Sequence, residues 1–337
     1  MKILLSSHFF HPSVGGIEEV SRVLAKQFVL AGHAVKVVTS TASDDGEPFP
    51  FEVIRRPNPA HLMRLVIACD VFFHNNISLQ TAWPLLLVKR PWVVAHHTWI
   101  ARVDGRIGWR DRLKQFVARN ARNISVSSAM SRHIAVPTTV IGNPYRDTLF
   151  RCDPLAVRDR ELVFLGRLVT DKGVDLLLDA LVLLRARGLV PRLSIIGQGP
   201  ELPRLREQSA RLGLDEQVEF MGVRSGGELV ALLNRHHLIV IPSRWQEPFG
   251  LVALEGVACG CVAVAARSGG LTDAIGKCGV TFRYDNIAEM ADRIAELLRP
   301  GADLAKFRAA APAHLARHSS LAVASQYLRV IEEAVAR

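Results

Sequence analysis

The sequence contains no long hydrophobic run, since no apolar stretch reaches the roughly 18 residues that a membrane-spanning helix requires. After Met1-Lys2 the chain enters a short strand-like run directly, without the pattern of a cleavable secretory signal. We therefore expect neither a membrane span nor a signal peptide, and we expect a cytoplasmic protein.

Cysteine is scarce and shows no metal-binding pattern. The five cysteines are odd in number and scattered, and only Cys259 and Cys261 are near each other. One residue separates these two, whereas about two to four residues separate the cysteines of a zinc-binding pair. The cysteines therefore predict buried free thiols in a reducing compartment, not a disulfide framework or a zinc site.

Motifs for nucleic-acid binding are absent, although the chain is basic. The formal net charge is +10, so nucleic acid, a phosphorylated substrate and acidic lipid all have to be considered as partners. The sequence has no helix-turn-helix, RNP-like aromatic motif or zinc finger, and we expect no nucleic-acid partner. Much of the charge is local, because residues 102–122 contain seven basic and two acidic side chains.

These basic residues belong to a segment, 99–122, that also carries apolar residues suited to one face of a helix: Ile107, Trp109, Leu113, Phe116 and Val117. An apolar face beside arginines is typical of a helix that lies on an anionic membrane surface, here the inner face of the cytoplasmic membrane. The alternative is a helix that packs on its own domain and leaves its arginines in solvent. The sequence leaves both interpretations open.

At 337 residues the chain is long enough for two domains. Within it, the stretch 237–260 combines several signals. Residues 237–241 have the length and β-branching of a buried parallel strand, and Pro242 and Ser243 end it. The loop that follows lies at the carboxyl end of the strand, where open α/β sheets bind ligands. We expect the next helix to begin at Pro248, so that the amides of Phe249, Gly250 and Leu251 face an anion.

Two carboxylates, Glu247 and Glu255, lie on either side of that helix start. They are about two helical turns apart and can face one cleft, one holding sugar hydroxyls and the other a ribose. Alternatively, Glu247 is a solvated residue favoured by the helix dipole and Glu255 an ordinary exposed helix residue. Neither glutamate decides this by itself.

Cations and glycines occur at other predicted strand ends. Arg167 can grip a phosphate with its fork and Lys172 can add a point charge, unless both are solvated cations at a helix start. Gly15 and Gly16 precede a helix predicted at 17–31 and allow a ligand close to the backbone, unless they form a plain turn. His97 follows a strand predicted at 92–96, where a histidine is often structural.

The run from Pro242 to Gly260 resembles the signature of the family 4 glycosyltransferases, also called group 1 glycosyltransferases. In that family a Pro-Ser pair precedes Glu-Pro-Phe-Gly, and a second Glu follows the first after seven residues. Here Glu247-Pro248-Phe249-Gly250 and Glu255 match in kind and spacing, with Gly256 where the family usually has Ala.

Other motifs of the family follow one another along nearly the whole chain. They comprise a Gly-Gly pair before the first helix, a His-Thr pair, Gly-Arg-x-x-x-x-Lys-Gly and Gly-x-Gly-Pro, matched at Gly15-Gly16, His97-Thr98, Gly166 to Gly173 and Gly197 to Pro200. The third glycine of a dinucleotide fingerprint is replaced by Leu202, so NAD binding is not expected. Pro144, Arg146 and Asp273 depart from the family pattern, which leaves the contacts at these positions open.

The resemblance implies an α/β protein of the GT-B fold, with two Rossmann-like parallel-sheet domains facing a cleft. We place an acceptor-side domain at 1–152, a nucleotide-sugar domain at 153–319 and a last helix, 320–337, packing back on the first domain. It further implies transfer of a hexosyl group from a nucleoside-diphosphate sugar to a hydroxyl, with retention, in surface polysaccharide, lipopolysaccharide or glycolipid synthesis. The acceptor would be a glycan or a lipid-linked molecule.

The resemblance also assigns roles to residues. It makes Glu247, His97, Arg167 and Lys172 catalytic, and gives contacts to the donor to a second set: Gly15, Gly16, Gly166, Gly199, Phe249, Gly250, Leu251 and Glu255. The sequence has no Asp-x-Asp motif, so we expect no metal and no cofactor, with the cations neutralising the diphosphate. A nucleotide-sugar epimerase or hydrolase of the same fold and a catalytically silent binding subunit are the alternatives.

Overall fold

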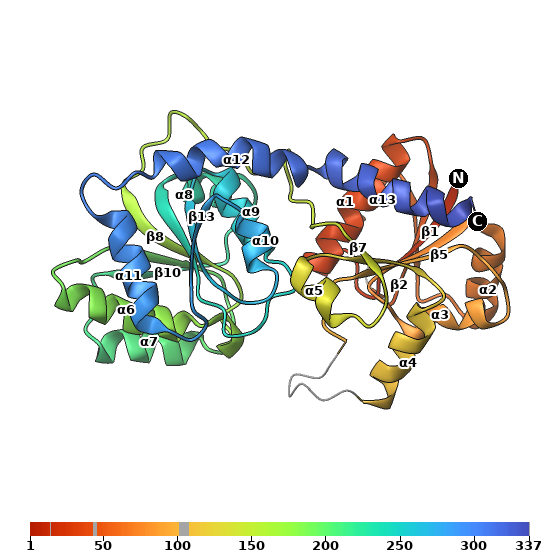
Figure 1. Cartoon of the computed structure of the whole chain (residues 1–337), viewed down its shortest axis with the longest axis horizontal. Coiled ribbons are helices and arrows are strands. Elements are labelled where there is room, and N and C mark those ends of the chain that lie inside the picture. Colours follow the sequence, from red (N-terminus) through yellow and green to blue (C-terminus); the bar gives the residue numbers. More distant parts are fainter. Residues whose placement is uncertain (14, 43–45, 101–107, 337) are drawn as a thin grey trace. The chain divides into compact units, whose positions relative to one another are not determined.

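The computed structural model of the chain describes residues 1–13, 15–42, 46–100 and 108–336 (Figure 1). The chain forms two compact units. Unit 1 consists of Met1–Pro144 and His318–Arg337, and unit 2 consists of Tyr145–Arg317.

Unit 1 is built around a seven-stranded parallel sheet with the order β3-β2-β1-β4-β5-β6-β7. Its strands are β1 (Lys2–Ser6), β2 (Ala34–Thr39), β3 (Glu52–Arg55), β4 (Val71–Asn75), β5 (Trp92–His96), β6 (Arg122–Ser125) and β7 (Thr138–Val140). Its helices are α1 (Gly16–Leu30), α2 (Pro59–Ala68), α3 (Leu79–Ala82), the 3₁₀ helix η1 (Trp83–Leu86), α4 (Trp109–Ala118), α5 (Ser128–His133) and α13 (Ser320–Val335).

Unit 2 contains a six-stranded parallel sheet with the order β10-β9-β8-β11-β12-β13. Its strands are β8 (Arg160–Leu165), β9 (Leu193–Ile196), β10 (Val218–Gly222), β11 (His236–Ile241), β12 (Val262–Ala266) and β13 (Gly279–Phe282). Its helices are η2 (Thr170–Lys172), α6 (Val174–Ala186), α7 (Leu202–Arg211), α8 (Gly226–Asn234), α9 (Leu251–Ala258), α10 (Leu271–Ile275), α11 (Ile287–Leu298) and α12 (Ala305–Arg317).

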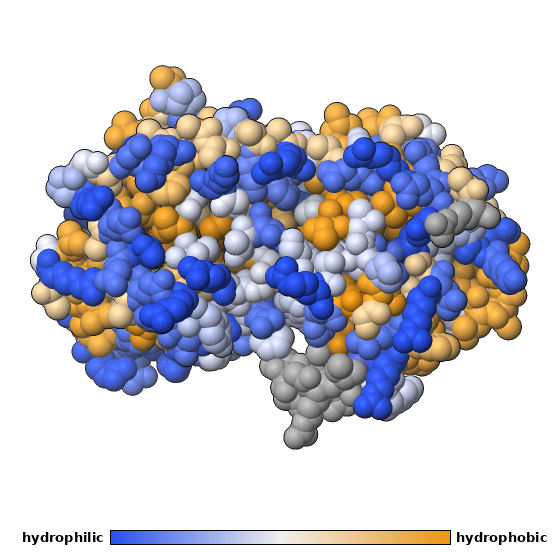
Figure 2. All heavy atoms as spheres, viewed as in Figure 1, coloured by the Kyte–Doolittle hydropathy of each residue, from blue (hydrophilic) through white to orange (hydrophobic). Residues whose placement is uncertain are grey.

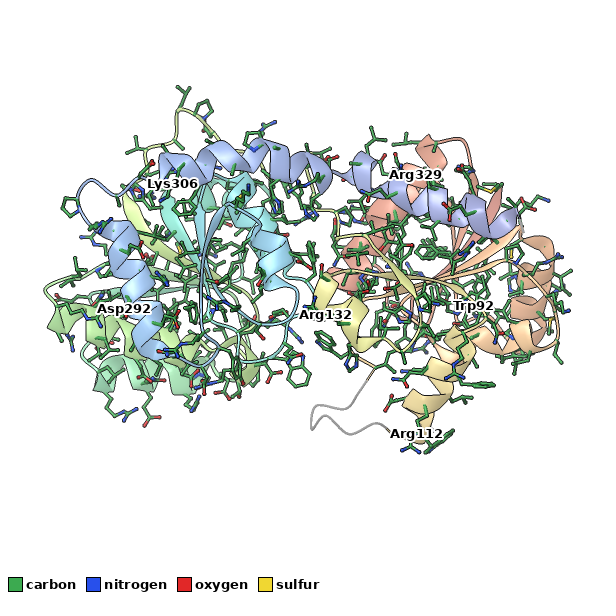
Figure 3. The ribbon with its side chains drawn as sticks, in the orientation of Figure 1. Trp92, Arg112, Arg132, Asp292, Lys306 and Arg329 are labelled. Carbon is green, nitrogen blue, oxygen red and sulfur yellow. The ribbon has the colours of Figure 1, made fainter. Side chains whose placement is uncertain are left out.

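Several inner strands of the two sheets are buried along their whole length. Every residue of β4, β5 and β12 is buried, as a parallel sheet covered by helices on both faces requires. Trp92, at the start of β5, lies inside unit 1 (Figure 3). The two parallel-sheet domains confirm the expected α/β class.

The last helix, α13, belongs to unit 1 and packs against α1, β4, β5 and β6. Its buried side includes Tyr327, whose ring meets that of Phe73 edge to face with centroids 5.7 Å apart. The side of α13 turned to the viewer in Figure 2 is largely hydrophilic. The amphipathic pattern of its sequence therefore corresponds to one packed and one solvated side.

The strand order reverses at one place in each sheet, between β1 and β4 and between β8 and β11. Loops at the carboxyl ends of strands beside such a reversal diverge and leave a crevice, which is where open α/β sheets bind ligands. In unit 2 these loops are 166–173, after β8, and 242–250, after β11.

Three local expectations were wrong. The helix after β11 begins at Leu251, not at Pro248, because Gly250 has a φ of +113° and interrupts helical geometry. Residues 123–128 read as a strand in the sequence, but β6 ends at Ser125 because Ser127 caps α5 by accepting a hydrogen bond from the Met130 amide at 3.1 Å. Four cysteines are buried as expected, but Cys152 is exposed.

Within the described part of the chain, no helix is long and apolar enough to cross a membrane.

Candidate active site

Two loops at the carboxyl edge of the unit 2 sheet are packed backbone against backbone. Gly173 has a φ of +67°, and a Cβ atom there would lie 2.1 Å from the carbonyl oxygen of Pro242. On the same side, the amides of Arg244 and Trp245 donate to the Asp171 carbonyl at 2.8 and 3.3 Å. The loop after β8 and the loop after β11 are therefore held together by contacts that only a glycine at position 173 permits.

This packing brings together two of the residues that the sequence singled out. The Lys172 ammonium forms an ion pair with Oε1 of Glu247, and the Ser243 hydroxyl donates to the same oxygen at 2.9 Å. The Glu247 side chain is 15% exposed and that of Lys172 is 26% exposed, so water screens the pair only in part. The loop itself is fixed by the Gly270 amide, which donates to the Glu247 carbonyl at 2.7 Å.

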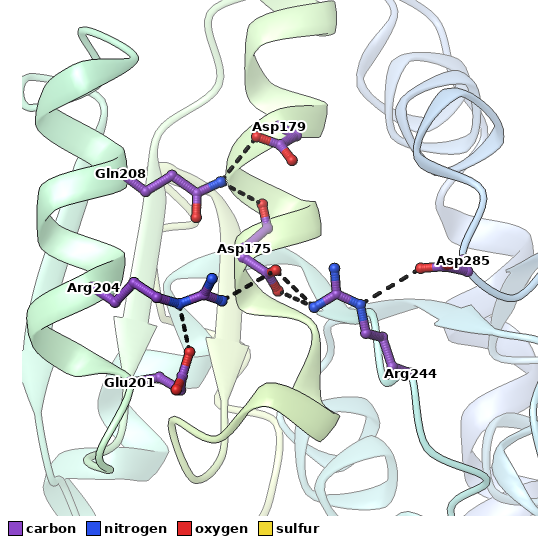
Figure 4. Close-up of polar contacts among 7 residues, drawn as sticks. All are labelled: Asp175, Asp179, Glu201, Arg204, Gln208, Arg244 and Asp285. Carbon is purple, nitrogen blue, oxygen red and sulfur yellow. Dashed lines mark hydrogen bonds and ion pairs between the residues drawn. The ribbon is translucent and has the colours of Figure 1, made fainter.

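A second ion-pair network lies behind this loop and was not foreseen from the sequence (Figure 4). Nη1 of Arg244 donates to both carboxylate oxygens of Asp175 at 2.7 Å, and Nη2 of Arg204 lies 3.4 Å from Asp175. Nε of Arg244 lies 3.5 Å from Asp285. Because Asp175 is in the first turn of α6, the network ties the loop of Glu247 to the helix that follows Lys172.

The other residues predicted to contact the donor differ in which of their groups a ligand can reach. Gly250 and Leu251 form the start of α9, whose first amides have no partner within the helix. The ring of Phe249 is buried, with 2% exposure, so only its backbone can face a ligand. Glu255 lies in α9 and is half-buried.

Arg167, in the loop after β8, is exposed. Among the residues that the structure describes, no acidic side chain pairs with it, so its guanidinium is available to an anion.

Gly166 and Gly199 have a packing role. A Cβ atom on Gly199 would lie 2.2 Å from the Leu168 carbonyl oxygen, and one on Gly197 would lie 1.8 Å from the Gly166 carbonyl oxygen.

The candidate residues of unit 1 lie at the carboxyl edge of its own sheet. Gly15 and Gly16 are exposed at the start of α1, after β1, and His97 follows β5. His97 is 5% exposed, and its Nε2 lies 2.7 Å from Oδ1 of Asn75 at the end of β4.

The neighbours of Asn75 fix the tautomer of His97. Nδ2 of Asn75 donates to the Ser21 hydroxyl at 2.7 Å, which leaves Oδ1 to accept from His97. Nε2 of His97 therefore carries the hydrogen and Nδ1 is the free acceptor. Burial, followed by the neighbouring His96, lowers the pKa of His97 to about 3, so the ring is neutral at pH 7.

Some of the residues that contact the predicted site residues could have been recognised from their position in the sequence. Asn75 ends a buried strand with a polar side chain, and Ser243 and Arg244 lie inside the signature stretch itself. The pairing of Asp175 with Arg244 joins residues far apart in the chain, and no sequence pattern indicated it. In the described ranges, no group of three His, Cys, Asp or Glu side chains is arranged to hold a metal ion.

The model of the family described as "Glycosyl transferases group 1" matches residues 146–314, which lie within unit 2. The chain belongs to the group 1 glycosyltransferases. Among these glycosyltransferases, the D-inositol 3-phosphate glycosyltransferase of Stackebrandtia nassauensis is 35% identical over 305 residues, 78% of this chain and 68% of that protein. A glycogen synthase of Mycobacterium tuberculosis is 37% identical over 153 residues, 44% of this chain and 37% of the synthase.

Solved glycosyltransferases show the same fold. HepE of Anabaena in complex with UDP has a TM-score of 0.84 at 21% identity, and the match covers 99% of this chain and 100% of HepE. WaaG, a glycosyltransferase involved in lipopolysaccharide biosynthesis, has a TM-score of 0.73 at 16% identity, covering 98% and 99%. The expected family, the GT-B fold and the transferase class are thereby confirmed.

Proposed function

We propose that this glycosyltransferase moves a hexosyl group from a nucleoside-diphosphate sugar to a hydroxyl acceptor, with retention of the anomeric configuration. The observation that carries the proposal is the contact between Lys172 and Glu247 at the carboxyl edge of the unit 2 sheet. It sets a cation and a carboxylate side by side, as a ligand with a diphosphate and a polyhydroxyl sugar needs. HepE is solved with UDP and with UDP-glucose, which makes UDP the first nucleotide to test.

The roles of the residues follow from where charge develops. Breaking the anomeric bond creates positive charge on the sugar and negative charge on the departing diphosphate. Arg167, Lys172 and the first amides of α9 stabilise the diphosphate, so that no metal ion is required. Glu247 orients the sugar hydroxyls and Glu255 holds the ribose. The acceptor proton leaves toward the donor phosphate.

On the acceptor side, Gly16 and His97 form the lining. His97 is neutral and its Nδ1 is an acceptor, so it orients a hydroxyl group and carries no positive charge. Gly15, Gly16 and His97 belong to unit 1. The residues proposed above to hold the diphosphate, the sugar and the ribose belong to unit 2.

Binding of nucleotides tests the donor site. Thermal shifts with UDP, GDP and ADP, alone and as hexose conjugates, should show stabilisation by one nucleotide class. A charge-assisted hydrogen bond contributes about 1.5–3 kcal/mol, so Arg167→Ala should weaken binding roughly 10- to 150-fold. Arg299→Ala is a matched control, because Arg299 is exposed at the far end of α11. Equal loss in both variants, or no shift with any nucleotide, would refute the site.

Turnover tests the reaction. Lys172→Ala combined with Arg167→Ala should abolish transfer, and the anomeric configuration of the product, read by NMR, should match that of the donor. Release of free hexose without an acceptor as the main reaction would instead identify a hydrolase. An inverted product would refute retention.

We also propose that α4 docks on an anionic membrane, which would place the enzyme at the inner face of the cytoplasmic membrane beside a lipid-linked acceptor. Trp109, Leu113 and Phe116 follow one another at helical spacing and are 69%, 39% and 61% exposed. They are therefore not packed on their own domain. Residues 101–107 of the basic segment lie outside the described residues.

Charge complementarity supports a lipid partner for this stripe. Arg110, Arg112 and Arg119 flank it, and Arg112 points away from the rest of unit 1 (Figure 3). Leu86 and Leu87 are also exposed, at 77% and 73%, beside the core cluster that joins α4 to α3 and η1. Apolar side chains beside arginines suit the boundary between anionic headgroups and acyl chains.

Liposome co-sedimentation tests the docking of α4. Binding should rise with the fraction of anionic lipid and fall when Trp109→Ala is combined with Arg110→Ala. Leu30→Ala, which removes a 78% exposed leucine at the end of α1, is the control and should leave binding unchanged. Binding that does not depend on anionic lipid or on the α4 variants would refute the proposal.

A further inference from the structure

A cluster of sulfur and positive charge lies at the opposite end of α9 from the donor site. Cys152 is exposed in the segment that leads into β8, and a Cβ atom on Gly260 would lie 3.0 Å from its sulfur. Cys152 is therefore held against the turn that contains Cys259 and Cys261, both of which are buried. The thiol of Cys259 hydrogen-bonds the backbone of Arg151, the residue next to Cys152.

Two guanidinium groups surround this cluster. Arg158 donates to the Cys259 and His236 carbonyls at 2.7 Å, and its Nη2 lies 3.5 Å from the sulfur of Cys152. Arg308 donates from Nε to the Gly260 carbonyl at 2.9 Å, while its buried Nη2 has no hydrogen-bond partner. Within the described residues, neither guanidinium has a carboxylate within salt-bridge distance. An exposed thiol beside cations that no described carboxylate neutralises is the setting in which cysteines react with oxidants.

We propose that Cys152 is a peroxide-reactive cysteine and that Cys259 is its resolving partner. The Cys152 thiolate attacks one oxygen of the peroxide, so that an S–O bond forms, the O–O bond breaks and hydroxide leaves. This step oxidises Cys152 to a sulfenic acid by two electrons and reduces the peroxide. The thiol of Cys259 then loses its proton and attacks the Cys152 sulfur, so that an S–S bond forms, the S–O bond breaks and water leaves. A dithiol reductant reverses the oxidation.

The two buried cysteines are not equivalent in this scheme. The thiol of Cys261 donates to the Leu233 carbonyl at 3.2 Å and lies 3.6 Å from that of His236, which directs it into the core. Burial raises the pKa of both buried thiols, so neither attacks peroxide by itself. Cys259, whose thiol contacts the backbone next to Cys152, is the one placed to resolve the sulfenic acid.

The consequence is a covalent tie at the far end of the helix that begins at the donor site. The α9 helix has eight residues, so about 12 Å separate its two ends. A disulfide between Cys152 and Cys259 would fix the segment before β8 to the end of α9.

Peptide mass spectrometry after treatment of the purified full chain with a limiting amount of hydrogen peroxide tests the inference. The expected product is a single disulfide between Cys152 and Cys259, with Cys69 and Cys278 still reduced. In Cys259→Ser, a dimedone adduct should accumulate on Cys152. The control Cys278→Ser should leave the disulfide unchanged.

The kinetics of labelling provide a second test that does not depend on disulfide formation. Cys152 should react with peroxide roughly tenfold faster than an unstructured cysteine peptide, and Arg308→Gln should reduce this advantage. A rate equal to that of the peptide, oxidation spread evenly over all five cysteines, or a disulfide to Cys261 would overturn the proposal.

Discussion

Replacement of Asn75 by aspartate is the sharpest test of how unit 1 controls His97. The side chains are nearly the same size, but the variant places a carboxylate where Oδ1 of Asn75 now accepts from His97 at 2.7 Å. In the native protein burial lowers the pKa of His97 to about 3. A negative charge in contact with the ring favours the imidazolium ion, so the pKa of His97 should rise.

The size of the rise follows from the distance. With charge centres about 4 Å apart and an effective dielectric constant of about 20, the attraction is about 4 kcal/mol. At about 1.4 kcal/mol per pKa unit this corresponds to about three units, and surveys of such pairs give about one to three. The pKa of His97 should therefore move from about 3 to about 4–6.

The assay is a pH titration of the imidazole nitrogens by NMR, with the His97 signal assigned by its loss in His97→Gln. This measurement is independent of whether His97 takes part in transfer. If it does, the acid limb of the pH profile for transfer should move to higher pH by the same amount in Asn75→Asp.

Asn76→Asp is the matched control. Oδ1 of Asn76 accepts from the His97 amide at 3.4 Å and from Thr98 at 3.2 Å, so the same new charge lies near the backbone and not on the ring. It should raise the pKa of His97 less. A native His97 that titrates near 6.5, or equal shifts in the two variants, would refute the reasoning.

Four further predictions concern the stability of the two units and the metal dependence of transfer. His74 is buried with its pKa lowered to about 3, so the free energy of unfolding should fall as the pH falls from about 6.5 toward 3, by up to about 1.4 kcal/mol per pH unit, and His74→Gln should show a smaller slope in urea titrations. Gly173→Ala should cost about 1–3 kcal/mol, whereas Gly188→Ala, with a φ of +77° and open space, should cost less; equal losses would contradict the close contact at Gly173. Asp175→Asn and Arg244→Gln should show a coupling of about 1–3 kcal/mol in a double-mutant cycle, and additive effects would argue against the ion pair. Transfer activity should survive EDTA, and loss that Mg²⁺ or Mn²⁺ restores would refute metal independence.

Local patterns were enough to predict most of the secondary structure. The strand predicted at 92–96 has the bounds observed, and the helix predicted at 17–31 is observed at Gly16–Leu30, because buried parallel strands and amphipathic helices have distinct periodicities. The signature around Glu247 and Glu255 likewise indicated the family that the comparisons confirm. These features depend on residues close together in the chain.

The loop between β11 and α9 shows where local reasoning ends. Pro248 suits the first turn of a helix. However, the Glu247 carbonyl accepts a hydrogen bond from the Gly270 amide, and α9 begins only at Leu251. The two partners of that hydrogen bond lie in the loops that follow two different strands. A short stretch of sequence therefore does not contain both of them. The exposed thiol of Cys152 is a similar case, since cysteine is usually buried.

The sequence by itself determined the two α/β domains, the family and which polar residues follow the strands, because each of these features depends on the spacing of residues that are close together in the chain. Only the tertiary structure decided which of these residues meet. The pairing of Lys172 with Glu247, the hydrogen bond that fixes the tautomer of His97 and the exposure of the apolar stripe on α4 all depend on which distant segments pack together. Packing between distant segments is set by the whole fold, and for that reason no local pattern encodes it.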